Sequence, residues 1–151
     1  MNEIDRALMA LHDLLNPVKV DWMIIGTSSL YITGYPVVPN DIDILTDAAT
    51  AKEIEQLLAD YRVASQVKPN EKFRSVFSQY NLNNFNIEVM GDLKVNTPDG
   101  WVLLRDQILN PQTVLFNGKA FIVPSKADQI AVYTLFNRAK DQPVLSMLRQ
   151  A

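Results

Sequence analysis

The sequence predicts an α/β or α+β fold built around a mixed β-sheet. Strand-like and helix-like segments intermix along the 151 residues, and no internal repeat, low-complexity segment or long linker interrupts them. The hydrophobic fraction of 48% and the charged fraction of 21% are ordinary for a globular chain with a real core. A chain of this length is expected to form one domain, spanning residues 1–151.

Charge and composition exclude several classes of protein. The net charge of -3 gives no overall basic surface for nucleic acid. The chain has no cysteine, which excludes disulfides and thiolate metal sites and is typical of a cytoplasmic protein. No apolar run reaches the roughly 18 residues that a membrane span needs, and the N-terminus lacks a signal-peptide pattern. We therefore expect a cytoplasmic protein with no membrane partner.

The first third of the chain predicts a helix, a strand, a short helix and a second strand. Apolar residues at helical spacing predict an amphipathic helix over residues 2–15. The apolar run 22–25 predicts a buried strand, and residues 26–29 break it and supply N-cap side chains for a short helix ending near Gly34. After a loop marked by prolines, residues 41–45 predict the second strand.

The middle of the chain predicts one helix and a hairpin. Thr50 and Glu53 have the spacing of a capping box, which predicts a helix running to about Asp60. Further strands are predicted at residues 61–65, 73–80 and 85–90, the last two joined by a turn over residues 81–84.

The last third predicts a second hairpin and two helices. Asn117-Gly118 between apolar runs is a strong hairpin signal, with strands over 113–116 and 120–123. Ser125 with Asp128 can cap a helix running to about Lys140. A final helix is predicted over residues 144–149, after Pro143.

The second strand carries two carboxylates on one side. Residues two apart in a strand share a face, so Asp41 and Asp43 point one way while Ile42 and Ile44 point into the core. Two adjacent carboxylates repel each other, and a divalent cation removes that repulsion. Mg²⁺ prefers such hard oxygen ligands and is commonly held by one or two carboxylates together with substrate phosphates.

These residues carry a resemblance to a known family. An apolar strand, Gly26-Thr27, a spacer and then Asp41-Ile42-Asp43 resemble the signature of the DNA polymerase β-like nucleotidyltransferase superfamily, with Thr27 in place of the usual Gly or Ser. The resemblance is densest over residues 20–45 and continues more weakly to Glu88. It implies a small nucleotidyltransferase-like domain, similar to antibiotic and minimal nucleotidyltransferases, with helices packed mainly on one face of the sheet.

The resemblance also implies a chemistry. Such enzymes use one or two Mg²⁺ ions to transfer a nucleoside monophosphate from an NTP to an acceptor hydroxyl, with release of pyrophosphate. Asp41 and Asp43 would be catalytic metal ligands. The third carboxylate of the family would be Glu88, as metal ligand or general base, because its neighbours take the core side of a strand. Asp92 is the rival, although Gly91 is expected to place it in a turn.

Four further residues are candidates for nucleotide binding. Gly26, Thr27 and Ser28 form a turn in which the backbone and hydroxyl groups can approach phosphates. Lys140, followed by an aspartate, loosely matches a late Lys-Asp pair near the nucleotide in resembling enzymes. The alternative for Lys140 is an interaction with the dipole at a helix C-terminus.

The partners expected from the resemblance are an NTP and an acceptor. A small molecule, including an aminoglycoside-like or lincosamide-like one, is the first expectation, and a protein or an RNA is also open. The chain is short for a separate acceptor domain, so a homodimer could complete the acceptor site. The alternative function is a catalytically inactive binding module of the same fold, serving as a nucleotide sensor or as a toxin–antitoxin component.

Overall fold

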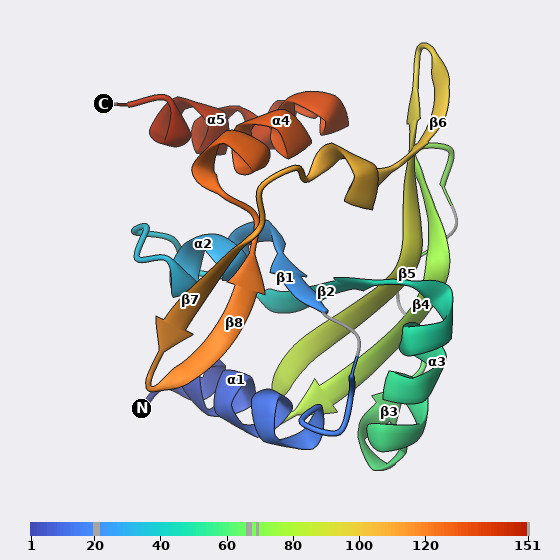
Figure 1. The fold of residues 1–151 in the computed structure, drawn as a ribbon, viewed down its shortest axis with the longest axis vertical. Coiled ribbons are helices and arrows are strands. Elements are labelled where there is room, and N and C mark those ends of the chain that lie inside the picture. The colour runs from blue at the N-terminus through green and yellow to red at the C-terminus, as the bar shows by residue number, and fades with distance from the viewer. Residues whose placement is uncertain (20–21, 66–67, 69, 151) are drawn as a thin grey trace.

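The computed structural model describes residues 1–19, 22–65, 68 and 70–150. Six strands of this part of the chain form a mixed sheet with the order β1-β2-β5-β4-β3, and β6 pairs with the far end of β5. A separate two-stranded ribbon consists of β7 and β8 (Figure 1). The strands are β1 (Met23–Ile25), β2 (Asp41–Thr46), β3 (Arg62–Val63), β4 (Phe73–Leu82), β5 (Phe85–Thr97), β6 (Gly100–Leu103), β7 (Gln112–Phe116) and β8 (Lys119–Val123).

Helices precede, separate and follow these strands. The α-helices are α1 (Glu3–Leu14), α2 (Gly26–Ile32), α3 (Ala48–Leu57), α4 (Lys126–Phe136) and α5 (Gln142–Leu148). Short 3₁₀ helices are η1 (Ala59–Tyr61), η2 (Leu104–Gln107) and η3 (Ala139–Asp141). The predicted fold class, a mixed sheet with helices, is confirmed, but helices cover both faces of the sheet rather than mainly one.

The centre of the sheet is a parallel pair. Strands β2 and β5 run parallel, whereas every other strand pair in the described chain is antiparallel. Since residues opposite each other in a register share a face, Ile42 and Ile44 lie beside Ile87 and Val89 on one face. The alternate residues of both strands point to the other face.

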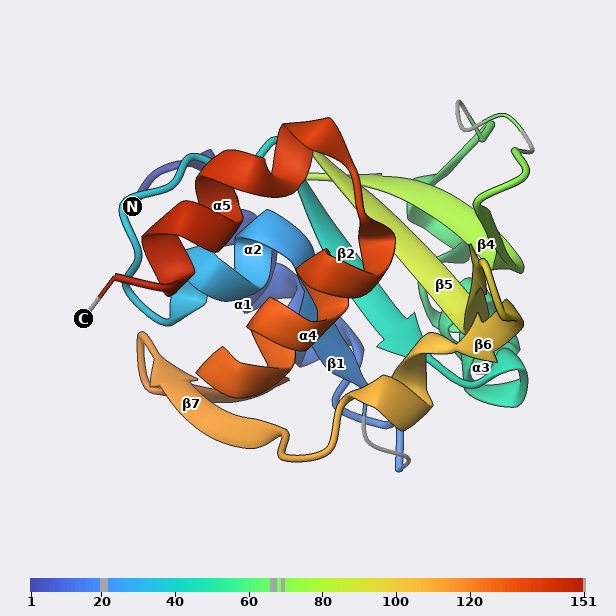
Figure 2. The ribbon, with the colours of Figure 1, turned by 90° about the horizontal axis from the view of Figure 1, so that it is seen from above.

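The two faces are covered differently. On the first face the central isoleucines and valine form a core with α1 and α3, so this face is closed. On the second face a separate core joins the outer parts of β1, β2 and β5 to α4 and α5. Figure 1 shows α4 and α5 on one side of the molecule and α1 on the other, and Figure 2 shows α4 beside α2.

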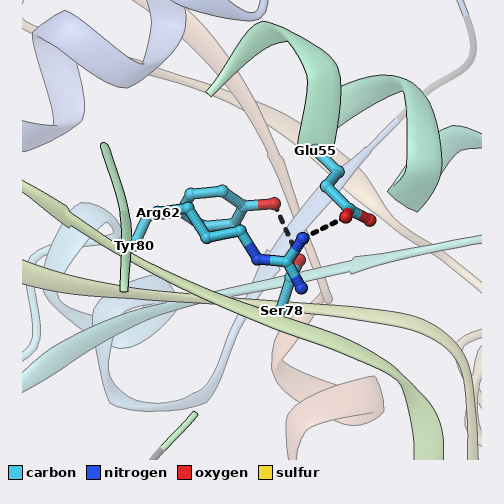
Figure 3. Close-up of polar contacts among 4 residues, drawn as sticks. All are labelled: Glu55, Arg62, Ser78 and Tyr80. Carbon is cyan, nitrogen blue, oxygen red and sulfur yellow. Dashed lines mark hydrogen bonds and ion pairs between the residues drawn. The ribbon is translucent and has the colours of Figure 1, made fainter. Parts of the chain in front are cut away.

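Two polar contacts lie at the β3 edge of the closed face, one within β4 and one between β3 and α3. The hydroxyl of Tyr80, a side chain with 0% exposure, donates to Ser78 Oγ at 2.8 Å. Arg62 of β3 forms an ion pair with Glu55 of α3 (Figure 3). The predicted strand over 61–65 is shorter than expected, since β3 comprises Arg62 and Val63, which lie opposite Tyr80 and Gln79 of β4.

Two predicted helix caps are wrong. Asp47 is the N-cap of α3, since its Oδ1 accepts from the Thr50 backbone N–H at 2.7 Å, and Thr50 lies inside the helix rather than opening a capping box with Glu53. Helix α2 begins directly at Gly26 without a side-chain cap. The polar residues after Gly26 are therefore helical, and the hydroxyls of Ser28 and Ser29 donate to the carbonyls of Ile25 and Gly26.

The β4–β5 hairpin is confirmed, with a tighter turn than predicted. Asn83 and Asn84 alone form it, with φ of 53° and 63°, in the left-handed region that asparagine tolerates. Strand β5 then continues far beyond its predicted end, with a bulge where β4 loses register. Asp92 lies in this bulge with φ of 50°, so the prediction that Gly91 places it in a turn is wrong.

The β7–β8 hairpin is confirmed at Asn117–Gly118. Ser125 caps α4 as predicted, with Oγ accepting from the Asp128 N–H at 3.2 Å. The helix stops at Phe136, because Asn137 adopts φ of 51° in the left-handed region. The prediction that this helix reaches Lys140 is therefore wrong, and Lys140 belongs to η3.

Candidate active site

Three carboxylates converge on the second face of the sheet. The parallel register places Asp43 directly beside Glu88, and Asp41 lies two residues before Asp43 on the same face. One carboxylate oxygen from each of the three residues lies within 4.8 Å of the others. Strand alternation in β2 and β5, together with their parallel pairing, is therefore what assembles the cluster.

Gly26 stands directly against this cluster. A Cβ added to Gly26 would lie 2.6 Å from Asp43 Oδ2, and the residue has φ of +69°. A side chain is thus disfavoured by both a clash and backbone strain. Glycine at this position lets the Asp43 carboxylate lie close to the backbone at the start of α2.

Ser28 lies behind the cluster rather than at its surface. The side chain is buried at 0% exposure and its hydroxyl donates to the Ile25 carbonyl at 3.1 Å. The same oxygen accepts from the Asp43 N–H at 3.4 Å. Ser28 therefore links α2 to β2, while its neighbour Thr27 is the residue of this turn whose side chain lines the cleft.

Burial and mutual repulsion disfavour charge on the carboxylates. Burial, followed by the negative charges of Asp41 and Glu88, raises the pKa of Asp43 well above its ordinary value. Burial and the adjacent Asp41 carboxylate raise the pKa of Glu88 to about 7, against opposing effects from Asn86 and Lys140. Asn86 Nδ2 donates to Glu88 Oε2 at 3.0 Å.

The cluster suits a hard divalent cation by its donor chemistry. It offers three carboxylates of the kind that Mg²⁺ prefers. The surrounding protein does not neutralise their negative charges fully, because burial and repulsion raise the pKa values of Asp43 and Glu88. A cation bound to Asp41, Asp43 and Glu88 would relieve that repulsion.

The cluster opens into a large cleft of about 880 Å³. Six of the seven predicted site residues line it together, and Ser28 is the exception: Gly26, Thr27, Asp41, Asp43, Glu88 and Lys140. The remaining wall is mixed, and its aromatic and aliphatic part from β4, β5 and α4 comprises Phe73, Phe77, Met90, Val132, Tyr133 and Phe136. Asp92 is not among the lining residues and is exposed in its bulge.

The segment after α4 brings basic residues to the cleft. Lys140 is exposed, lines the cleft and lies near enough to lower the pKa values of Asp43 and Glu88. Arg138 is engaged by the protein, since it donates twice to Asp141 at 2.7 and 3.1 Å and lies over the Phe136 ring. Lys140 has no ion-pair partner among the described residues.

Sequence analysis missed two polar residues of the site. Asn86 shares the strand face of Glu88, so the alternation of β5 could have indicated it. Tyr133 lies on α4 at 4% exposure and lines the cleft. No local signal marks Tyr133, because its position depends on how α4 docks against α2.

Paired carboxylates on a strand, beside a glycine turn that opens a helix, define the class of nucleotidyltransferases. The family model for aminoglycoside-2''-adenylyltransferases matches residues 7–130, and the chain belongs to that family. It is therefore a nucleotidyltransferase. Among curated proteins, no sequence matches the chain.

Solved structures agree on the fold. TM1012 of Thermotoga maritima, a proposed nucleotidyltransferase, is 29% identical with a TM-score of 0.78, over 96% of this chain and 91% of that one. The lincosamide antibiotic adenylyltransferase LnuA, bound to lincomycin, has 17% identity and a TM-score of 0.64, over 99% and 98% of the two chains. ANT(2'')-Ia in complex with adenylyl-2''-tobramycin has 11% identity and a TM-score of 0.61, over 95% and 80%.

No helix among the described residues is both long enough and apolar enough to cross a membrane.

Proposed function

We propose that this protein transfers a nucleoside monophosphate from an NTP to the hydroxyl of a small molecule, in a Mg²⁺-dependent reaction that releases pyrophosphate. The observation that carries the proposal is the convergence of Asp41, Asp43 and Glu88 beside Gly26 in one large cleft. Asp41 and Asp43 would hold Mg²⁺, and Glu88 would complete the ligand set or accept the proton of the acceptor hydroxyl. When bound, Mg²⁺ supplies charge neutralisation on the transferred phosphoryl group.

The nucleotide phosphates are assigned to the Gly26 side of the carboxylates. Gly26 lines the cleft and lets the Asp43 carboxylate lie against the backbone, and Thr27 lines the cleft next to it. Ser28 would contribute from behind, by fixing the strand that carries Asp43. Lys140 lines the same cleft and offers the triphosphate a positive charge that has no ion-pair partner among the described residues. Since LnuA and ANT(2'')-Ia are adenylyltransferases by name, ATP is the first NTP to test.

The acceptor is assigned to the β4 side. In-line displacement places the attacking hydroxyl opposite the leaving pyrophosphate, hence across the carboxylates from Gly26. Strand β4 lies there, beyond β5, with Phe77 opposite Met90 in the register. Farther along β4, Arg74 stacks over the Trp101 ring at 3.6 Å and also lines the cleft. The lining is thus aromatic and basic on this side.

Charge argues against a polycationic acceptor. Apart from the three clustered carboxylates, the described cleft lining contains one acidic residue, Asp141. Its carboxylate forms an ion pair with Arg138. An amine-rich aminoglycoside would therefore meet basic side chains without free carboxylates. We propose a hydroxyl acceptor that is neutral or anionic and carries an apolar part. The predicted homodimer stays a prediction.

The proposal is tested by pyrophosphate release. Mg²⁺ and each of the four common NTPs are combined with tobramycin, with lincomycin, and with neutral and anionic hydroxyl compounds. We expect turnover with an acceptor of the last two kinds, and loss of turnover in Asp41→Asn. Calorimetry of Mg²⁺–NTP binding runs alongside.

The binding data separate the proposal from its alternative. An inactive binding module is disfavoured by membership of an adenylyltransferase family. Tight Mg²⁺–NTP binding with no turnover across a broad acceptor panel would favour that module. Efficient turnover of tobramycin would contradict the proposed acceptor chemistry while supporting nucleotidyl transfer.

A further inference from the structure

A buried hydrogen-bond chain fixes the Gly26 turn from the distant helix α4. Gln129 Nε2 donates to Ser29 Oγ at 2.8 Å, and Ser29 Oγ donates to the Gly26 carbonyl at 2.6 Å. The side chains of Gln129 and Ser29 are 3% and 0% exposed, so water does not compete for these bonds. Helix α4, which lies beside α2 in Figure 2, is thereby bonded to the turn that lies against Asp43.

Tyr133 is one helical turn beyond Gln129, on the same side of α4. Its ring packs edge-on against Phe136, and its hydroxyl is buried. The hydroxyl has no hydrogen-bond partner of normal geometry among the described residues. A buried polar group without a partner costs free energy, and such a group in a native structure points to a bond made in another state.

The surroundings of this hydroxyl identify its partner in that state. Burial, followed by the negative charges of Asp141 and Asp43, raises the pKa of Tyr133, against opposing effects from Arg138 and the Thr27 side chain. The phenol therefore keeps its proton, and the Thr27 side chain lies within interaction range of its hydroxyl without the geometry of a normal hydrogen bond. Both Tyr133 and Thr27 line the cleft.

We propose that Tyr133 is a positioning residue, whose hydroxyl donates to Thr27 Oγ1 when a nucleotide is bound. A threonine hydroxyl has one proton and two acceptor sites. Phosphate oxygens only accept, so Thr27 must donate its proton to the phosphate and can then accept from Tyr133. The Tyr133 bond would fix the direction of the Thr27 proton. This inference rests on the proposed nucleotide site.

A double-mutant cycle tests the inference. Tyr133→Phe, Thr27→Val and the double variant are compared with the unmodified protein in calorimetric binding of Mg²⁺ with ATP and of Mg²⁺ with inorganic tripolyphosphate. We expect each single variant to bind about 5- to 10-fold more weakly, and the double variant to bind no more weakly than the worse single variant. Without ligand, the Tm of Tyr133→Phe should be unchanged or higher, because the removed hydroxyl has no partner.

Tyr80→Phe is the matched control. Its hydroxyl is also buried but is bonded to Ser78 on the closed face (Figure 3), so we expect a lower Tm and unchanged ligand affinity. Unchanged affinity in Tyr133→Phe, additive losses in the cycle, or a lower Tm in Tyr133→Phe would overturn the inference. Failure of the unmodified protein to bind either ligand would instead overturn the proposed nucleotide site, and the inference with it.

Discussion

The two faces of strand β2 differ in what their residues do. Ile42 and Ile44 are 0% exposed and pack into the core with α1 and α3. Asp41 and Asp43 alternate with them and line the cleft on the other side. Within six residues, one face supplies folding free energy and the other concentrates repelling charges. Stability and chemistry should therefore respond to different substitutions in the same strand.

Asp43→Asn should produce the largest effect on activity. It removes a proposed metal ligand, and a metal that supplies several kcal/mol of transition-state stabilisation corresponds to a loss on the order of 10³-fold. The Tm in metal-free buffer should hold or rise, because a repelling charge is removed from the cluster. Pyrophosphate release and thermal unfolding are measured on the same preparation. A large drop in metal-free Tm would show that Asp43 is a structural residue.

Ile44→Ala tests the other face of the same strand. Truncating a fully buried isoleucine costs about 2–5 kcal/mol of unfolding free energy, which lowers the Tm by roughly 10 °C for a chain of this size. Below the transition, the turnover number should change little. Loss of activity without loss of stability would contradict the separation of the two faces.

Stability without metal should fall as pH rises. The pKa of folded Glu88 is raised to about 7. A raised carboxyl pKa stabilises the folded state below the unfolded value and loses that contribution as pH rises through the folded value. The Tm in chelator should therefore decrease between about pH 5 and pH 8. Glu88→Gln, which cannot ionise, should make the Tm less dependent on pH. If the Tm of the variant fell with pH as steeply as that of the unmodified protein, other groups would cause the pH dependence.

Lys140→Ala should give the smallest effect. The lysine is exposed, so its loss should leave the Tm within about a degree while weakening Mg²⁺–NTP binding about 5-fold. Lys52→Ala, an exposed lysine of α3 behind the closed face, is the matched control and should change neither quantity. Equal nucleotide affinity in both variants would return Lys140 to the role of an ordinary surface residue.

Sequence patterns predicted the parts of the site that depend on local periodicity. The alternation of apolar and polar residues in β2 and β5 was sufficient to predict that Asp41, Asp43 and Glu88 point away from the core. The structure brings their carboxylates together. Gly26 was indicated by its place between a strand and a helix. The cap at Asp47 was missed because Thr50 offered an equally good local pattern, and hydrogen-bond geometry decides between them.

Other parts depend on contacts between distant segments. The left-handed conformation of Asn137 ends α4 early, which moves Lys140 off the helix, and asparagine alone does not require that conformation. The bond between Gln129 and Ser29 joins residues far apart in the chain, and it sets where Tyr133 lies. No periodicity carries that information, because it is a property of how two helices dock.

The parallel pairing of β2 with β5 has a consequence for the order of folding. The two strands are separated along the chain by α3 and β4, whereas β4 and β5 are joined by a two-residue turn. Local hairpins close faster than long-range parallel pairs, since loop-closure entropy must be overcome first. We therefore expect the acidic cluster to be completed only after the hairpin has formed, with its repulsion opposing that late step. On this order, the nascent chain should have no three-carboxylate cation site until its core has closed.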